Sequence, residues 1–145
     1  MNVQPQTVSA ADTGQPRERI ELAAAYRLIA HYHLDDSIFT HISARAPAEE
    51  GEHAFLINPF GLRFDEVTAS SLVTVDINGD ILRDNHGAGI NKAGFTIHSA
   101  VHMAREEAGA VLHLHAADGV ADGARAAGVM PCNCAAALSG RRSSS

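Results

Sequence analysis

The chain has 145 residues, of which 46% are hydrophobic and 19% charged, and its formal net charge is −6 at pH 7. This length predicts one domain with a core of moderate size. The acidic balance offers no basic surface to nucleic acid, and no segment reaches the roughly 18 uncharged apolar residues of a membrane-spanning helix. We therefore expect neither nucleic-acid binding nor membrane insertion.

The two ends of the chain differ in composition from its middle. Residues 1–18 are rich in Gln, Pro, Ser and Thr without apolar periodicity, which predicts a disordered lead-in and not a secretory signal. Residues 132–145 hold the two cysteines, too few for a disulfide framework, and we expect a disordered tail there. Residues 19–131 are then the predicted domain, with the cytoplasm as its expected location.

The first predicted element is an amphipathic helix that starts at about residue 19. Leu22, Tyr26, Ile29 and His33 share one helical stripe in a segment of good helix formers.

Short β strands are expected after this helix. Apolar runs bounded by turn residues occur in FTHISARA, HAFLINPFG and SLVTVDINGDIL. The last of these contains Asn78-Gly79 between two apolar runs, which is a strong hairpin signal.

A second helix is predicted over residues 92–107. Ile97, Val101 and Ala104 are its expected core stripe, with two histidines beside that stripe. A strand over residues 110–115 follows.

A last helix, capped by Asp118 and closed by Gly128, completes the predicted elements. The alternation of helices and strands predicts a mixed α/β fold.

His113 and His115 stand at alternate positions of the predicted strand 110–115. Alternate side chains of a strand share a face, so the two imidazoles, about 7 Å apart along the strand, can converge on one ion. They also lie at the carboxyl end of the strand, where α/β sheets usually place ligand sites. The pattern predicts half of a zinc or manganese site. The alternative is a pair of histidines hydrogen-bonded to backbone or carboxylate groups.

His98 and His102 are four residues apart on the predicted second helix and therefore share a face. One of them could supply a further ligand, or a hydrogen bond to a ligand, beside the strand histidines. Packing against the sheet is the favoured interpretation for His102, and both interpretations stay open for His98.

The run from about Ile20 to Pro131 resembles the class II aldolase/adducin N-terminal domain family. The resemblance is carried by LAAAYRLIAHYHLDD, FTHISAR, FLINPFGLRFDEVTASSLVTVDINGDIL, NKAGFTIHSAVHMAR and AVLHLHAADGVA. It implies a three-layer α/β/α sandwich with a mainly antiparallel central sheet, which would be incomplete at the C-terminus here. It also implies a homo-oligomer with active sites between subunits.

Enzymes of this family act on phosphorylated sugars and related small hydroxy-carbonyl compounds as lyases or epimerases. A divalent metal, usually zinc, stabilises the enediolate intermediate. The resemblance places His113 and His115 on two metal-ligand positions, with zinc favoured and manganese or cobalt as alternatives. A third histidine ligand is expected from a later segment, but no histidine follows His115.

The resemblance also implies positions that bind substrate phosphate. Thr40 and His41 match the family's first phosphate loop, and Phe60 and Gly61 lie in the turn that matches its second contact. Lys92 stands at the start of the second predicted helix, where its charge and the helix N-terminus favour a phosphate.

The family's acid/base glutamate falls on Gly94, which cannot transfer a proton. His98, one helical turn later, is the nearby titratable residue that could act as a catalytic group in its place. The family domain continues past Pro131, so we expect a truncated or reading-frame-altered member.

These features predict a metal-binding class II aldolase-like domain whose catalysis is impaired. The alternative is a non-catalytic assembly module of the adducin type, associated with the cytoskeleton. Metal binding distinguishes these two functions, because an assembly module has no need of His113 and His115.

Overall fold

An antiparallel five-stranded sheet is the centre of the fold, with the strand order β4-β3-β2-β1-β5. In this computed structural model, which describes residues 15–51 and 53–123, the strands are short. Their bounds are β1 (His41–Arg45), β2 (Phe55–Ile57), β3 (Val73–Val75), β4 (Ile81–Arg83) and β5 (Ala110–His113).

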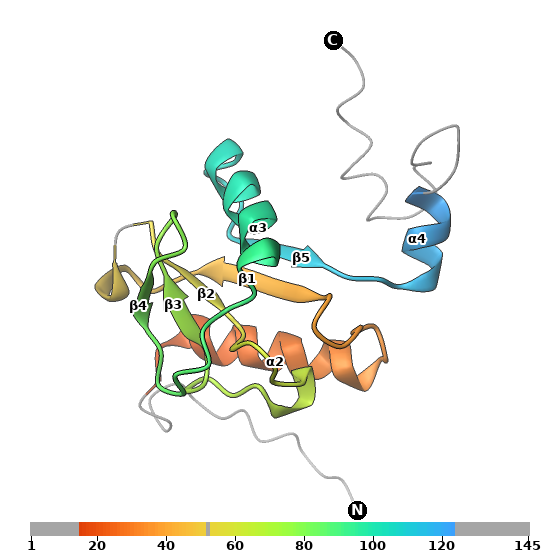
Figure 1. Ribbon diagram of the computed structural model, residues 1–145, viewed down its shortest axis with the longest axis horizontal. Helices are drawn as coiled ribbons and strands as arrows, with labels where there is room; N and C mark the ends of the chain where they lie inside the picture. The colour runs from red at the N-terminus through yellow and green to blue at the C-terminus, as the bar shows by residue number, and fades with distance from the viewer. Residues whose placement is uncertain (1–14, 52, 124–145) are drawn as a thin grey trace, which may run out of the picture. The chain divides into compact units, whose positions relative to one another are not determined.

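Two helices cover opposite faces of this sheet (Figure 1). Helix α2 (Arg17–His31) packs on the face that carries the even-numbered residues of β1 and β2, and α3 (Lys92–Ala104) packs on the other face. The core on the α2 side consists of Leu22, Ala23, Tyr26, Ile42, Leu56, Phe64, Val67 and Leu72. The core on the α3 side consists of Phe55, Ile57, Val73, Val75 and Phe95. The expected α/β fold with an antiparallel sheet is confirmed.

The chain divides into two compact units, the first ending at Leu114 and the second beginning at His115. Helix α4 (Ala117–Gly123) belongs to the second unit and has Asp118 in its first turn. The expected closing residue Gly128 and the expected tail at residues 132–145 lie outside the described residues, as do residues 1–14. Within the described part, no helix combines the length and apolar character needed to cross a membrane.

The hairpin predicted from Asn78-Gly79 is confirmed. Strands β3 and β4 pair antiparallel, the Asp76 N–H donates to the Asp80 carbonyl at 2.9 Å, and Gly79 adopts a φ of 86°. That left-handed conformation suits glycine at this turn position.

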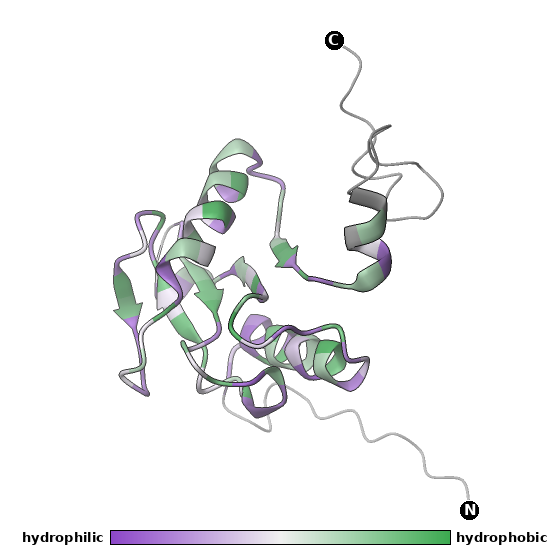
Figure 2. Cartoon of the chain, turned by 45° about the vertical axis from the view of Figure 1, so that its right-hand side comes forward, coloured by the Kyte–Doolittle hydropathy of each residue, from purple (hydrophilic) through white to green (hydrophobic). Residues whose placement is uncertain are grey.

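The core stripe expected for the second helix is wrong. Ile97 is 55% exposed and Val101 is 36% exposed. The buried face of α3 consists instead of Gly94, Phe95, His98, Ser99 and His102. Figure 2 shows the mixed hydropathy of this helix, with hydrophilic positions interspersed among hydrophobic ones. The helix is turned this way because its two histidines find hydrogen-bond partners on the sheet, which offset the cost of burying them.

Helix α2 is fixed by a buried arginine. The Arg19 side chain is fully buried and donates to both carboxylate oxygens of Glu50 at 2.6 Å, to the Leu72 carbonyl at 2.8 Å and to Thr74 Oγ1 at 2.6 Å. Burial of the Glu50 carboxylate opposes its ionisation, but the hydrogen bonds and charge of Arg19 outweigh this, and the pKa of Glu50 lies below its usual value. The ion pair therefore joins α2 to the sheet.

Candidate functional site

A chain of buried imidazoles lies between α3 and the sheet. His41 and Ser43 are alternate residues of β1 and face α3, which contributes His98 and His102. His41 Nδ1 is 3.2 Å from His98 Nε2, and Ser43 Oγ is 2.6 Å from His98 Nδ1 and 2.9 Å from His102 Nε2. At the far end, His102 Nδ1 is 3.2 Å from the Ala108 carbonyl. These five groups form one continuous hydrogen-bonded path, which we call the histidine relay.

Burial keeps the inner members of the relay neutral. Desolvation lowers the pKa of His98 to about 4, and the nearby His41, His102 and His113 add to the effect through charge repulsion. Desolvation also lowers the pKa of His102, against the opposing effect of its hydrogen bond to the Ala108 carbonyl. Both rings are therefore uncharged at neutral pH.

Neutral rings give the relay a defined direction. A carbonyl oxygen only accepts, so His102 Nδ1 must donate to Ala108, which leaves His102 Nε2 as an acceptor for the Ser43 hydroxyl. The Ser43 oxygen then accepts from His98 Nδ1, and His98 Nε2 accepts from His41 Nδ1. The hydrogen bonds thus assign a proton to Nδ1 of His41.

The ring of His41 lies directly against Gly94. A Cβ atom on Gly94 would be 2.1 Å from His41 Nε2, which is closer than any real contact of that kind. The helix is positioned there by Asn91, whose side chain accepts from the Gly94 N–H at 3.2 Å and donates to the Ile38 carbonyl at 3.1 Å. No side chain, and no carboxylate in particular, fits at position 94 while His41 keeps this place.

His113 lies on the same face of the sheet as His41. The two residues are directly opposite in the register of β1 and β5, and their ring centroids are 5.3 Å apart at an interplanar angle of 25°. His113 is half-buried, whereas His115 is exposed and belongs to the second unit. The structure therefore brings His41, His98 and His113 together, and the pairing of His113 with His115 stays a sequence-based prediction.

The imidazole nitrogens of these histidines are of the type that binds divalent cations. Neutral imidazole suits zinc, and a tautomer fixed by a partner on the other ring nitrogen is typical of histidine ligands. Residues 15–51 and 53–123 contain no group of three or more His, Cys, Asp or Glu side chains placed to hold an ion. The described residues therefore show no complete ligand set, and the metal-ligand roles of His113 and His115 stay a prediction.

The remaining predicted phosphate-binding residues are spread over different environments. Thr40 is buried, and its hydroxyl accepts from the Asp36 N–H at 2.9 Å. Phe60 is 47% exposed, and Gly61 has a φ of 85° in the turn after it. Lys92 is the exposed first residue of α3. Their binding of phosphate stays a prediction.

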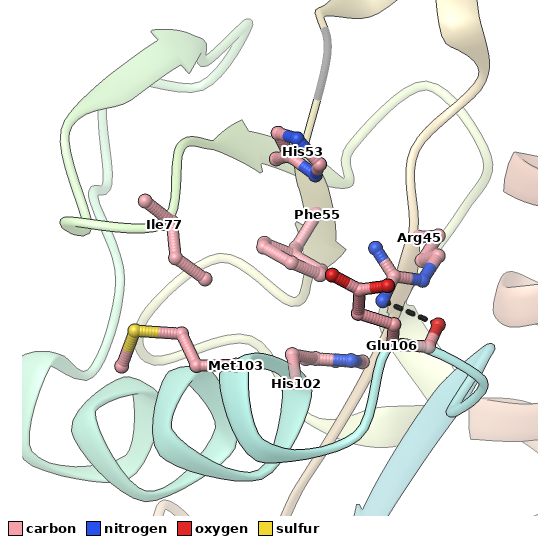
Figure 3. A pocket seen from close by; sticks show the side chains of 7 residues that line it. All are labelled: Arg45, His53, Phe55, Ile77, His102, Met103 and Glu106. Atoms are coloured by element: carbon pink, nitrogen blue, oxygen red, sulfur yellow. Dashed lines mark hydrogen bonds between the residues drawn. The ribbon is translucent and has the colours of Figure 1, made fainter.

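A pocket that the sequence did not predict lies at the other end of the relay (Figure 3). Its volume is about 240 Å³, and it is lined by Arg45, His53, Phe55, Ile77, His102, Met103 and Glu106. The His102 ring stacks on Phe55 at 4.2 Å, and Arg45 donates to the Glu106 carbonyl at 2.7 Å. His102 therefore links this pocket to the relay.

Fold and site together define an α/β domain whose antiparallel sheet presents a histidine-rich face to one helix. The family model of the class II aldolase and adducin N-terminal domain matches residues 20–140. The chain belongs to the class II aldolase and adducin N-terminal domain family, as its motifs suggested.

Curated relatives come from both branches of the family. A Caulobacter vibrioides protein that is named an aldolase class 2 protein is 58% identical over 113 residues, which cover 78% of this chain and 43% of that protein. Mouse alpha-adducin is 46% identical over 123 residues, which cover 84% of this chain and 16% of alpha-adducin. The chain thus spans less than half the length of these relatives.

Solved structures agree with the fold. An aldolase II superfamily protein from Pseudomonas syringae matches with a TM-score of 0.77 and 51% identity, covering 92% of this chain and 54% of that one. L-fuculose 1-phosphate aldolase from Glaciozyma antarctica matches with a TM-score of 0.67 and 36% identity, covering 81% of this chain and 47% of that one.

Proposed function

We propose that this chain is a class II aldolase-type domain that holds a divalent cation through His113 and His115 and lacks the family's proton-transfer group. The cation is zinc by preference, with manganese or cobalt as alternatives. The observation that carries the loss of the proton-transfer group is the contact of His41 with Gly94, which leaves no room for a side chain at the position that the resemblance assigns to the family's glutamate. A domain of this kind would keep two metal ligands, but it would lack the side chain that transfers protons during catalysis.

A similar solved structure supports the proposed substrate class. One solved structure of the same fold is an L-fuculose 1-phosphate aldolase, so small hydroxy-carbonyl or sugar-phosphate compounds are the proposed ligands. A bound cation would polarise the carbonyl of such a compound. The chain's own contribution would be to orient that compound, with Lys92 at the start of α3 available to attract a phosphate group.

A second candidate function is assembly without catalysis. It is favoured by the 46% identity with mouse alpha-adducin over 84% of this chain. A cytoskeleton-associated module of this kind would be a homo-oligomer, and the cytoplasm is the location proposed for either function. Unlike the first function, it requires neither His113 nor His115.

The test is the zinc content of the purified chain after dialysis, measured by elemental analysis. His113→Ala/His115→Ala removes the proposed ligands. His31→Ala/His33→Ala is the matched control, because it removes two exposed histidines with the same spacing.

Near-stoichiometric zinc in the wild type and the control, with loss in the His113/His115 variant, is the expected result. Equal zinc in all three proteins, or none in the wild type, would overturn the cation site. The assembly function would then be the better description.

A further inference from the structure

We propose that the pocket at the His102 end of the histidine relay binds a small amino acid with an apolar side chain. The carboxylate of this ligand pairs with Arg45, its ammonium group with Glu106, and its side chain contacts Ile77 and Met103. The inference does not depend on the cation site proposed above. All the residues that line the pocket lie in the first unit, and they do not include the proposed metal ligands.

The pocket forms because α3 ends before it has covered its whole face of the sheet. Arg45 and Phe55 are directly opposite each other in the register of β1 and β2, and Ile77 follows the end of β3. Helix α3 ends at Ala104, so space remains between its last turn and these residues. The volume of about 240 Å³ lies just below the usual range of small-molecule sites, which suits a ligand as small as an amino acid.

Arg45 provides a fixed positive charge in this pocket. Within residues 15–51 and 53–123, no ion pair involves Arg45. Its guanidinium group lies 5.6 Å from the centroid of the Phe55 ring and donates to the Glu106 carbonyl at 2.7 Å. Desolvation is the main cause of the lowered pKa of His102, and the charge of Arg45 adds to it. A guanidinium group has several N–H donors in one plane, so Arg45 can still bind a carboxylate through paired hydrogen bonds.

The end of α3 offers the negative charge that an ammonium group needs. Glu106 also lines the pocket, and Figure 3 shows it on the same side as Arg45. The carbonyl groups in the last turn of a helix carry a partial negative charge, which favours a cation there. A ligand with a carboxylate alone would face the like charge of Glu106. A zwitterion therefore fits this side of the pocket better than a simple acid.

The opposite side of the pocket is apolar. Figure 3 shows Ile77 and Met103 across the pocket from Arg45 and Glu106. Met103 is 62% exposed, and its flexible thioether side chain can adapt to ligands of different shape. An aliphatic side chain placed against these two residues would remove apolar surface from water. This favours an amino acid such as leucine over a polar one.

The experiment titrates the full chain with L-leucine and follows the methyl signals of Ile77 and Met103 by NMR spectroscopy. Two matched probes are titrated in the same way. Isocaproate has the carbon skeleton of leucine without the amino group, and isoamylamine lacks the carboxylate. Because both probes are tested on the wild type, this comparison does not depend on the folding of any variant.

Variants test the two charged partners separately. Arg45→Gln and Glu106→Gln remove the proposed partners of the carboxylate and the ammonium group. Arg63→Gln and Glu107→Gln are the controls, because both residues are exposed and neither lines the pocket. Thermal unfolding of each variant shows whether it is folded.

Saturable shifts of both methyl signals with L-leucine are the expected result. Binding should be at least about tenfold weaker for isoamylamine and for Arg45→Gln, and about two- to fivefold weaker for isocaproate and for Glu106→Gln. The control variants should bind as the wild type does. Methyl signals that L-leucine does not shift saturably would overturn the site. Isocaproate that binds as tightly as L-leucine would overturn the role of Glu106, and isoamylamine that does so would overturn that of Arg45.

Discussion

The imidazole of His41 lies where a side chain on Gly94 would begin, with His41 Nε2 only 2.1 Å from the position of a Cβ atom. The contact joins β1 to the first turn of α3. A histidine at position 41 in this conformation therefore requires glycine at position 94.

Replacing Gly94 by alanine is expected to destabilise the chain by about 1–3 kcal/mol, because the added methyl group overlaps the His41 ring. A glycine-to-alanine substitution inside a helix normally has the opposite effect and stabilises the protein by roughly 0.5–1 kcal/mol. The measurement is the free energy of unfolding in urea. Gly109→Ala, where nothing lies within 4 Å of the added atom, is the control and should cost far less. A cost for Gly94→Ala that persists unchanged in a His41→Ala background would show that the overlap is not its cause.

Ser43→Ala is expected to break the centre of the relay. It leaves His98 Nδ1 and His102 Nε2 buried without the hydroxyl that now pairs with both, at a cost of about 1–3 kcal/mol for each. Exposed Ser70→Ala should change the unfolding free energy by less than about 0.5 kcal/mol. Equal unfolding midpoints for the two variants would contradict the relay.

Stability is expected to fall as the pH drops from about 6.5 toward about 4. In the unfolded chain His98 binds a proton near its ordinary pKa of 6.5, whereas burial holds its pKa at about 4 in the folded chain. The unfolded state therefore binds more protons in this window, and acid favours it by roughly 1 kcal/mol per pH unit. Urea unfolding at pH 7, 6 and 5 with a chelator present measures the slope. The His98→Gln variant should flatten it, and an equal slope in this variant would exclude His98 as the cause.

Arg19→Ala is expected to destabilise the chain by about 3–5 kcal/mol, because it leaves the Glu50 carboxylate beside the sheet without its partner. Arg17→Ala is a closely matched control on the same helix. Its ion pair with Glu21 is exposed at both ends, so its loss should change the free energy of unfolding very little. Similar losses in thermal unfolding for both variants would argue against the buried pair as the anchor of α2.

Local sequence signals were sufficient for much of the fold. The Asn78-Gly79 hairpin follows from the backbone preference of its turn residues, and Leu22 and Tyr26 are buried as the helical stripe of α2 predicts. Such signals act over a few residues, and they need no knowledge of what packs against the element.

The buried face of α3 could not be predicted in the same way. Apolar periodicity counts histidine as polar, so it favoured Ile97 and Val101 over His98 and His102. The hydrogen bond that reverses this choice joins His98 to Ser43, which is 55 residues earlier, and it depends on which face of β1 meets the helix. A usable signal was present, since His41 and Ser43 alternate on a strand while the two helix histidines are four apart.

The most direct test of the central claim, that a directed histidine relay presents His41 Nε2 beside Gly94, is the ring ¹⁵N spectrum of the histidines at neutral pH. Long-range ¹H–¹⁵N correlation reports which nitrogen of each neutral ring carries the proton. The hydrogen bonds require protonated Nδ1 in His41, His98 and His102. Finding all three in that tautomer is the expected result, and a His41 ring protonated on Nε2 would contradict the claim.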